Sequence, residues 1–203
     1  MTEKILQAIK ELREKTKKRN FPQSFDLIIK LKEFDAKKPE NKLNEEIVLP
    51  NGTGSDAEVV VFSDDIKDAR LKILTTNDIS RMNKKEGKKL VRNTDFFLAE
   101  PKLMPTIAKT LGAYLGPVGK MPKLISDDVK STAENYKISV RARIKDSPVI
   151  QCPVGKEDMK DEKIVENIGA VLRHLESKLP RGKNNVGRVM LKLTMSKPVN
   201  VEV

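Results

Sequence analysis

The stretch NGTGSDAEVVVFSD, residues 51–64, marks the point where the pattern of the chain changes, and it decides the fold. NGTGSD, residues 51–56, is rich in Gly, which is typical of a linker. EVVVFSD, residues 58–64, is a short continuous apolar run, which is typical of a strand covered on both faces. DFFLAE, residues 95–100, is a second run of this kind. Such strands belong to parallel sheets, whose connections are usually helices.

Helices are expected around these two strands. Segments with a helical or mixed pattern lie at residues 66–72, 77–93, 103–116 and 127–137, and a further strand is expected at 73–76. The segment GPVGKMPKLI, residues 116–125, is rich in Gly and Pro and is expected to be a loop. Strands that alternate with helices predict βαβ units. We therefore predict that residues 59–137 form an inserted, Rossmann-like α/β domain with a parallel sheet.

The segments on either side of this insertion have a different pattern. Helices are expected at residues 4–17 and 159–180, and strands at 24–35, 45–50, 137–144, 148–155 and 186–203, the last with a turn inside it. The turn KDSP, residues 145–148, favours antiparallel pairing of the strands that flank it. We predict a discontinuous, two-layer α+β domain with a mainly antiparallel sheet from residues 1–58 and 138–203. Linkers near Gly52–Asp56 and near Lys137 would join the two domains and act as a hinge.

The charge of the chain favours a polyanionic partner. The 203 residues include 40 Lys and Arg against 29 Asp and Glu, a formal net charge of +11, and cations that neutralise phosphates release condensed counterions. Residues 59–137 carry a net charge of +5 and the remainder +6, so charge alone does not locate the binding surface. Aromatic residues make up only 4%, without Trp. This disfavours binding by successive stacked bases and leaves recognition of backbone and shape in folded RNA or DNA.

Three features indicate the compartment. No run approaches the roughly 18 apolar residues of a membrane span. The N-terminal sequence MTEKILQAIKEL lacks the apolar stretch of a signal peptide. Cys152 is the only cysteine, so no intrachain disulfide can form, which agrees with a reducing environment. We predict a cytoplasmic protein without membrane contact.

Motifs for nucleotide binding are incomplete. GPVGK, residues 116–120, departs from the spacing of a phosphate loop, because Met121 follows the Lys and Leu115 stands where the first Gly is required. No G-x-G-x-x-G follows the strand at 58–64. We predict no cofactor.

Catalytic and metal sites also lack their usual residues. His174 is the only histidine and Cys152 the only cysteine, which leaves metal sites and catalytic triads without partners. We interpret His174 as a helix-surface residue and Cys152 as a small buried hydrophobe. Acidic clusters at Asp64–Asp65, Asp127–Asp128 and Asp158–Glu162 are expected at helix starts, where carboxylates favour the helix dipole. We predict a protein that is not an enzyme and holds no metal.

Three short segments of the flanking domain carry polar or exposed residues that have two interpretations: each taken singly is more simply a strand edge or a turn, and together they suit a binding surface. Phe21 follows the basic run KTKKRN, residues 15–20, and precedes Pro22, which places it at a strand entrance. In each of the two other segments, polar residues alternate with apolar residues along an expected strand, so the polar side chains of that segment lie on one face. They are Ser24, Asp26 and Lys30, and Lys192, Thr194 and Ser196 with Met195 among them.

The sequence as a whole resembles the L-one family of large-subunit ribosomal proteins in its archaeal form. The matching stretches, in family order, are NFPQSFDLIIKLKEFDAKKPEN, IVLPNGTG, DFFLAEPKLMP, LGPVGKMPK, VGKEDMKDEKIVENIGAVL and LKLTMSKPV. They span essentially the whole chain, and LGPVGKMP and the LTM ending are the specific ones. The resemblance implies the same two-domain architecture as the pattern analysis.

The resemblance also implies a function and a set of residues. It implies a protein that holds the mobile stalk of large-subunit rRNA near the tRNA exit site, and that often represses translation of its own messenger RNA through a stalk-like structure. Exit-site tRNA would then be an indirect partner, and the free protein is predicted to be a monomer. The implied RNA surface comprises Phe21, Ser24, Asp26, Lys30, Thr194, Met195 and Ser196, to which we add Lys192.

Two positions depart from the family pattern. Ser196 stands where the family usually has Gly after Thr-Met, which matters if that position needs a positive φ or a close approach of RNA. Asn51 replaces the usual His of the LPHG segment. We expect the hydroxyls of Ser24 and Thr194 to bind RNA sugar edges, Phe21 and Met195 to shield those bonds from water, and lysines to attract phosphates.

Other functions remain open at the level of sequence. They are a free translational repressor that uses the same surface, an α/β enzyme or small-ligand-binding protein with a basic surface, and a general DNA-binding protein. The absence of a helix-turn-helix pattern disfavours the last of these.

Overall fold

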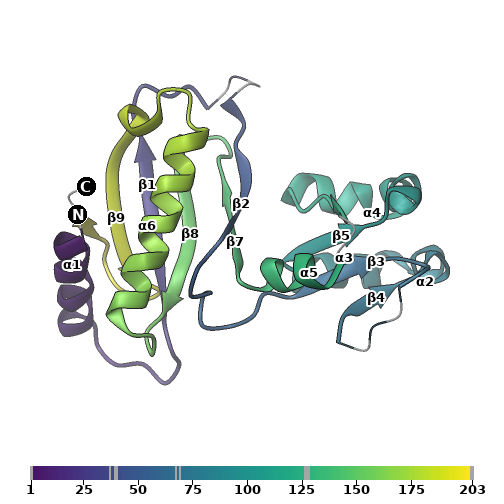
Figure 1. Cartoon of the computed structure of the whole chain (residues 1–203), viewed down its shortest axis with the longest axis horizontal. Helices are drawn as coiled ribbons and strands as arrows, with labels where there is room; N and C mark the ends of the chain where they lie inside the picture. The colour runs from purple at the N-terminus through teal and green to yellow at the C-terminus, as the bar shows by residue number, and fades with distance from the viewer. Residues whose placement is uncertain are drawn as a thin grey trace. The chain divides into compact units, whose positions relative to one another are not determined.

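A computed structural model describes residues 2–36, 38, 41–66, 68, 70–125 and 129–201. The chain divides into two compact units. Figure 1 shows both, with the colour running by residue number from the N-terminus to the C-terminus. Unit 1 comprises Met1–Ser55 and Ile138–Val203, and unit 2 comprises Asp56–Lys137. The first boundary therefore lies three residues before the predicted position, and the second lies between Lys137 and Ile138.

Unit 1 is built on a four-stranded antiparallel sheet with the strand order β10-β9-β1-β8. A separate antiparallel pair joins β2 to β7. The elements of unit 1 are α1 (Thr2–Lys15), β1 (Ser24–Leu31), β2 (Asn44–Val48), β7 (Ser139–Arg143), β8 (Val149–Lys156), α6 (Asp161–Lys178), η3 (Gly182–Asn185), β9 (Val186–Leu193) and β10 (Val199–Val201). Central strand β1 thus pairs on both edges with strands that follow the insertion.

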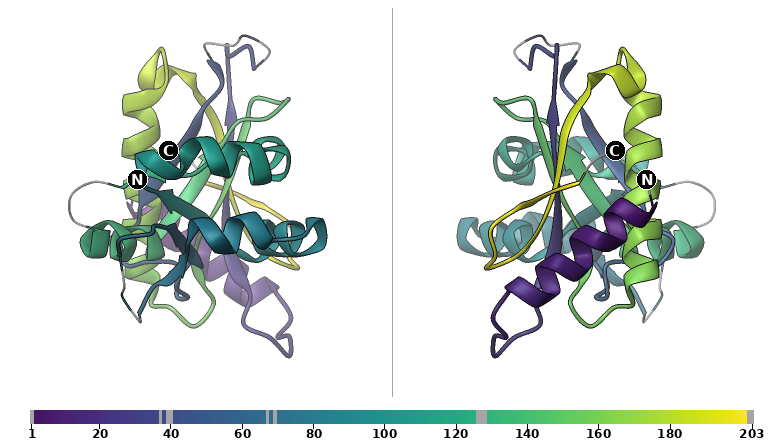
Figure 2. Two further views of the ribbon diagram at one scale, coloured as in Figure 1. Left: turned by 90° about the vertical axis from the view of Figure 1, so that its right-hand side faces the viewer. Right: turned by 90° about the vertical axis from the view of Figure 1, so that its left-hand side faces the viewer.

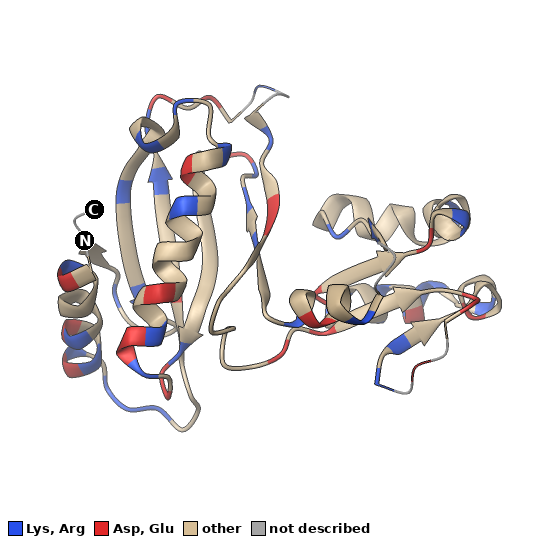
Figure 3. Ribbon diagram, viewed as in Figure 1, with Lys and Arg blue, Asp and Glu red and all other residues tan. Residues whose placement is uncertain are grey.

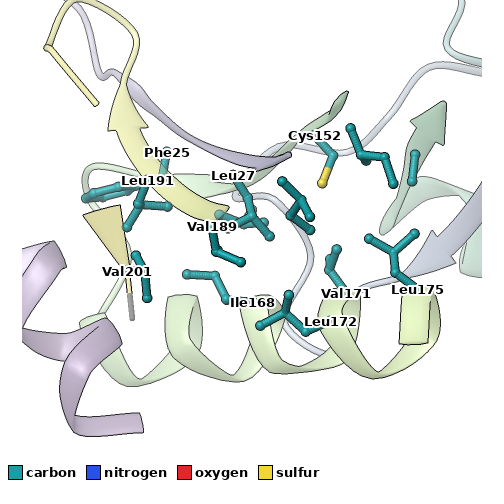
Figure 4. Packing of buried hydrophobic residues seen from close by; sticks show 14 of the residues in the cluster. Phe25, Leu27, Cys152, Ile168, Val171, Leu172, Leu175, Val189, Leu191 and Val201 are labelled. Atoms are coloured by element: carbon teal, nitrogen blue, oxygen red, sulfur yellow. The ribbon is translucent and has the colours of Figure 1, made fainter. Parts of the chain in front are cut away.

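The core of unit 1 lies between this sheet and the helices α1 and α6, which contact each other (Figure 2). β1 alternates strictly, so that Phe25, Leu27, Ile29 and Leu31 are buried while the intervening side chains face away from the helices. Figure 4 shows side chains of the sheet directed at the apolar stripe of α6. That stripe comprises Ile164, Ile168, Val171, Leu172 and Leu175. Burial of each such side chain contributes about 1.5–3 kcal/mol.

Unit 2 is built on a four-stranded parallel sheet with the strand order β4-β3-β5-β6. Its elements are β3 (Val59–Phe62), β4 (Lys72–Leu74), α2 (Thr76–Arg81), α3 (Lys84–Asn93), β5 (Phe96–Ala99), η2 (Pro101–Leu103), α4 (Met104–Val118), β6 (Lys123–Leu124) and α5 (Val129–Lys137). Every residue of β3 and β5 is buried, because α2, α3 and α4 pack on one face of the sheet and α5 packs on the other. The predicted fold class is confirmed in both units.

Two predicted local structures are wrong. The strands on either side of KDSP do not form a hairpin, since β7 pairs with β2 and β8 pairs with β1. Two strands of matching length from the first segment of the chain take these places, since β2 and β7 have 5 residues each and β1 and β8 have 8 each. The described residues of the expected helix at 66–72 are not helical, and Lys72 already belongs to β4; the segment has only two large apolar side chains with which to pack. Lys67 and Ala69 lie outside the described residues.

The segment 116–125 is only partly a loop. Helix α4 continues through Pro117 to Val118 and ends at Gly119, whose φ of 71° is left-handed. Pro117 lies in the last turn of the helix, where its missing N–H removes a single intrahelical bond. The irregular part is confined to residues 119–122, and β6 follows.

The single cysteine and histidine lie where the sequence placed them. Cys152 is 2% exposed in the core of unit 1, and burial, with a smaller effect of the Asp26 charge, raises the pKa of its thiol to about 12. His174 lies on α6 with its Nε2 3.4 Å from Oε2 of Glu45. Asp161 and Glu162 lie in the first turn of α6. Asp64 instead accepts from the N–H of Thr76 at the start of α2, and Asp127–Asp128 lies outside the described residues.

Candidate functional site

The end of β1 and the end of β9 meet at one edge of unit 1. The N–H of Thr194 donates to the carbonyl of Ser24 over 3.1 Å, and the N–H of Ser24 donates to the Thr194 hydroxyl over 3.1 Å. The Thr194 hydroxyl also lies 3.5 Å from the Ser24 carbonyl oxygen. The threonine side chain therefore prolongs the β1–β9 ladder beyond Leu193, the last residue of β9.

Residues Thr194–Ser196 form a turn, whereas alternation along a strand had been expected. The Ser196 hydroxyl accepts from the N–H of Leu193 over 2.8 Å, and the Ser196 N–H donates to the Leu193 carbonyl over 3.0 Å. Ser196 does not have a positive φ; among the described non-Gly residues only Glu33 has one. A serine is thus compatible with the backbone at this position, and its hydroxyl closes the turn.

The turn is attached to the start of β1 by a buried side chain that sequence reasoning missed. Gln23 is 0% exposed. Its Oε1 accepts from the N–H of Met195 over 3.1 Å, and its own N–H donates to Oε2 of Glu157 over 3.2 Å. The sequence did contain a signal for this position. Gln23 lies two and four residues before Phe25 and Leu27, so the alternation of an extended strand directs all three side chains to the same inward face.

Glu157 is itself held in place by Arg13 of α1. The guanidinium of Arg13 donates to the carbonyls of Glu157 and Met159 over 2.5 and 2.8 Å and to Oδ1 of Asp161 over 2.9 Å. It also lies 5.4 Å from the centroid of the Phe25 ring. A continuous set of contacts therefore runs from Arg13 through Glu157 and Gln23 to the backbone of the turn.

Two large apolar side chains are exposed at this edge. Phe21 is 47% exposed and Met195 is 57% exposed. Both are next to segments that Gln23 fixes, and neither is needed to close the core. We call the set Phe21, Gln23, Ser24, Thr194, Met195 and Ser196 the turn site. Exposed apolar side chains on a rigid polar frame are typical of a binding surface.

The second face of the sheet, opposite α1 and α6, continues the turn site along β1 and β9. Asp26 stands opposite Lys192, and Lys30 opposite Arg188. The Lys192 ammonium donates to the Thr194 carbonyl over 3.0 Å. Burial raises the pKa of the Asp26 carboxyl, and the charge of Lys192 partly offsets this shift.

The predicted site residues are only partly brought together. Ser24, Thr194, Met195 and Ser196 meet at the turn, Phe21 lies three residues before Ser24 along the chain, and Asp26 and Lys192 adjoin the turn. Lys30 shares their face but lies six residues along β1 from Ser24, which is about 20 Å for an extended chain.

Cations surround the turn site. Lys17, Lys18 and Arg19 are all exposed and lie in the segment between α1 and Phe21. Figure 3 shows this segment in blue, at the same end of the sheet as the start of β1. Phosphate groups are attracted to such a border by charge, independently of base sequence.

The lysine of GPVGK in unit 2 is bonded to backbone carbonyls of the same unit. The Lys120 ammonium donates to the carbonyls of Val91 and Thr94 over 3.0 and 2.5 Å. It therefore caps the C-terminal end of α3, as cations commonly do. This lysine of GPVGK has a structural role, and its ammonium points at carbonyl groups of its own unit.

The carboxyl ends of the parallel strands, where ligands bind in many α/β folds, are acidic here. The Ser63 hydroxyl is hydrogen-bonded to Glu100 and accepts from the N–H groups of Asp65 and Ile66 over 3.1 and 2.9 Å. Asp64 is bonded to Thr76. These internal bonds and negative charges disfavour an anionic ligand. Over the ranges that the structure describes, no cluster of His, Cys, Asp and Glu suits a metal ion.

Comparisons with known proteins point to one family. The model of the ribosomal protein L1p/L10e family matches residues 12–197. The chain is 40% identical over 210 residues to the large ribosomal subunit protein uL1 of Pyrococcus horikoshii, with 98% of this chain and 96% of the relative covered. It is 41% identical over 209 residues to uL1 of Methanocaldococcus jannaschii, with 98% and 95% covered. For uL1 of Methanobrevibacter smithii, the values are 39% over 211 residues, with 99% and 100% covered.

None of the helices in the described ranges is long and apolar enough to cross a membrane.

Proposed function

This chain belongs to the ribosomal protein L1p/L10e family, and from that premise we propose that it is a structural component of the large ribosomal subunit in the cytoplasm. In this role the chain is not an enzyme. It binds the stalk of large-subunit rRNA beside the tRNA exit site, and it contacts exit-site tRNA only indirectly.

The turn site is the observation that supports this proposal. Its backbone is fixed by contacts between residues more than 130 positions apart in the sequence, Gln23 with Glu157 and with Met195. A frame of this kind is formed before RNA arrives, so little ordering opposes binding. RNA is then recognised by its local shape and its 2′-hydroxyls.

The hydrogen-bonding groups of the site have separate tasks. The Ser24 hydroxyl makes no hydrogen bond with the part of the chain that the structure describes, which leaves it available to a ribose. The Thr194 hydroxyl accepts from Ser24 and retains a second lone pair. Phe21 and Met195 flank these groups and exclude water, which strengthens hydrogen bonds in the complex.

The cations near the turn site orient the RNA through its phosphates and do not recognise its base sequence. Lys30, Lys192 and the segment Lys17–Arg19 attract phosphates. Asp26 lies beside Lys192 and, as a carboxylate on an RNA-binding face, accepts from a 2′-hydroxyl. The same surface would bind a stalk-like structure in the messenger RNA of this protein and so repress its translation, because local RNA shape is what the surface reads.

The experiment measures binding of the whole chain to an rRNA fragment that carries the stalk, across a series of salt concentrations. The variants are Phe21→Ala and Thr194→Ala, with Val48→Ala as a matched control, since Val48 is 49% exposed on the same unit. We expect tight binding with a shallow salt dependence, and a loss of about 2 kcal/mol or more in each test variant. Thr194→Ser should retain most of the affinity.

The opposite result is equally clear. Weak binding with a steep salt dependence, unchanged in Phe21→Ala and Thr194→Ala, would mean that the turn site is only part of a basic surface. The stalk assignment would then be abandoned.

A further inference from the structure

Helix α3 presents a row of cations on unit 2. Within its sequence KKEGKKLVRN the basic residues are Lys84, Lys85, Lys88, Lys89 and Arg92, all of them exposed. At 100° per residue they cover a continuous arc of about 140°. The other residues of the helix lie outside that arc. We call these five residues the α3 cationic face.

Ion pairs within the described residues do not account for these cations. None of the five forms an ion pair with the residues that the structure describes. Glu86, the single acid of the helix, accepts from the N–H of Asn83 in the capping box. Like charges three and four residues apart destabilise a helix. Ion pairing within unit 2 therefore does not account for the row of five, in which only Lys88 has a described contact, with the Tyr114 ring.

The helix that carries them is held firmly. A Cβ at Gly87 would lie 3.1 Å from Cδ2 of Leu111, so glycine lets α3 approach α4 closely. Lys120 caps the C-terminal end of α3, and Asn83 caps its N-terminal end. The Lys88 ammonium lies 5.9 Å from the centroid of the Tyr114 ring. The row is thus fixed in position on the unit.

We propose that the α3 cationic face binds the phosphate backbone of double-stranded RNA. This goes beyond the proposed function, because the contact lies on the other unit and reads charge density in place of local shape. Lys84, Lys88 and Arg92 follow one another at a rise of about 6 Å along the helix axis. Double-stranded DNA carries one charge per about 1.7 Å of its axis. An RNA duplex also has two phosphates per base pair, so several phosphates come within reach of the row.

A nucleic acid fits this face better than an acidic protein. Protein interfaces centre on large apolar or aromatic side chains that become fully buried. The large apolar side chains exposed in the described ranges are Phe21, Val48, Val118, Met121, Leu124 and Met195, and none of them belongs to α3.

The test uses two variants of the full chain with equal charge. In one, the five residues of the α3 cationic face are replaced by Gln, which keeps the helix propensity high. In the other, five exposed lysines elsewhere on unit 2 are replaced by Gln, namely Lys72, Lys102, Lys109, Lys123 and Lys130. Both have a net charge five lower than the parent. Binding to a 20-base-pair RNA duplex without the stalk is measured from 50 to 200 mM salt.

We expect the α3 variant to bind this duplex about 10- to 100-fold more weakly than the matched control at 50 mM salt. Each phosphate neutralised contributes about −0.9 to the slope of log affinity against log salt for a duplex. The slope of the α3 variant should therefore be shallower than that of the control by about 2 to 4. Equal affinities and slopes in the two variants overturn the proposal and leave the face for an acidic protein.

A second readout separates this proposal from the turn site. Acetylation of Lys84, Lys85, Lys88 and Lys89 is measured by mass spectrometry in the parent chain with and without the duplex. Protection of these lysines supports the proposal even if binding to the stalk fragment fails, and full reactivity in the complex overturns it even if stalk binding is tight.

Discussion

The turn site of unit 1 and the α3 cationic face of unit 2 differ in how their polar groups are held. In the turn site, Gln23 and Thr194 are each bonded to the backbone of another segment, and Ser196 is bonded to the backbone of its own turn. On α3, the five cations have no ionic partner among the described residues. A fixed frame selects the shape of its ligand, whereas free ammonium groups respond to charge density and are weakened by salt. One protein thus presents one surface suited to specificity and another suited to general attraction.

The largest effect is expected from a substitution at Gln23, whose side chain holds the backbone of the turn site. Gln23→Leu leaves the N–H of Met195 without its buried acceptor and removes the 3.5 Å contact of Gln23 Nε2 with Glu157, whose bond to the backbone N–H of residue 23 remains. We expect a loss of about 2–3 kcal/mol in the free energy of unfolding and roughly a 100-fold loss of affinity for the stalk fragment. Urea unfolding and the binding assay measure the two effects, with the exposed Gln7→Leu as control. If binding is unchanged while stability falls, the frame serves folding alone.

A smaller loss of stability and affinity is expected from a substitution at Arg13, which contacts Glu157 and does not contact the turn itself. Arg13→Lys keeps the charge but cannot make the three directed bonds to Glu157, Met159 and Asp161. We expect a loss of about 1–2 kcal/mol in stability and a smaller loss of affinity than in Gln23→Leu. Arg173→Lys, at an exposed position of α6, is the matched control. Equal effects in the two arginine variants would show that Arg13 does not support the turn.

The third prediction concerns the cations of α3 and has the opposite sign. Replacing the five residues by Gln removes five like-charge pairs at spacings of three and four residues. We expect the free energy of unfolding to rise by about 1 kcal/mol at low salt, and the gain to shrink as salt screens the repulsion. Urea unfolding at 20 and 500 mM salt measures it. A loss of stability would mean that these cations do support the fold.

The smallest effect is expected at Asp26. Burial raises the pKa of its carboxyl, so the folded state favours the protonated form. The ionised carboxylate therefore opposes folding at neutral pH, and its protonation relieves this as the pH falls through the raised pKa. Asp26→Asn should increase stability by at most about 0.5 kcal/mol at pH 7, with no gain below the unfolded pKa near 3.8. Thermal unfolding from pH 3 to 7 tests this, and a gain that persists at pH 3 contradicts it.

Much of the fold was predictable because both units follow simple periods. Alternation in β1 and the continuous apolar runs of β3 and β5 identify a sheet covered on one side and a sheet covered on both. Local pattern does not specify the choice of strand partner, which is why the KDSP hairpin prediction failed. It also missed the helical end of α4, because Gly119, and not Pro117, terminates that helix.

The candidate site was predictable only in its outward residues. Period two placed Ser24, Asp26 and Lys30 on one face, and the resemblance indicated the segment around Met195. The supporting contacts of Arg13, Gln23 and Glu157 join segments 134 or more positions apart, and no local pattern reports such distances. The turn at Thr194 likewise depends on its bonds to Ser24.

The pairing of β1 with β8 and β9 also determines the order in which the two units can fold during synthesis of the chain. Unit 2 is complete once synthesis has passed Lys137, and domains generally fold as units as they emerge. β1 must wait for residues 149–156 before its first edge is paired and for residues 186–193 before its second edge is paired. We therefore expect the inserted unit to fold first, while the surface formed by Phe21 and Met195 exists only after residue 196 has been made. A growing copy of this protein would therefore be unable to bind RNA through the turn site until residue 196 had been made.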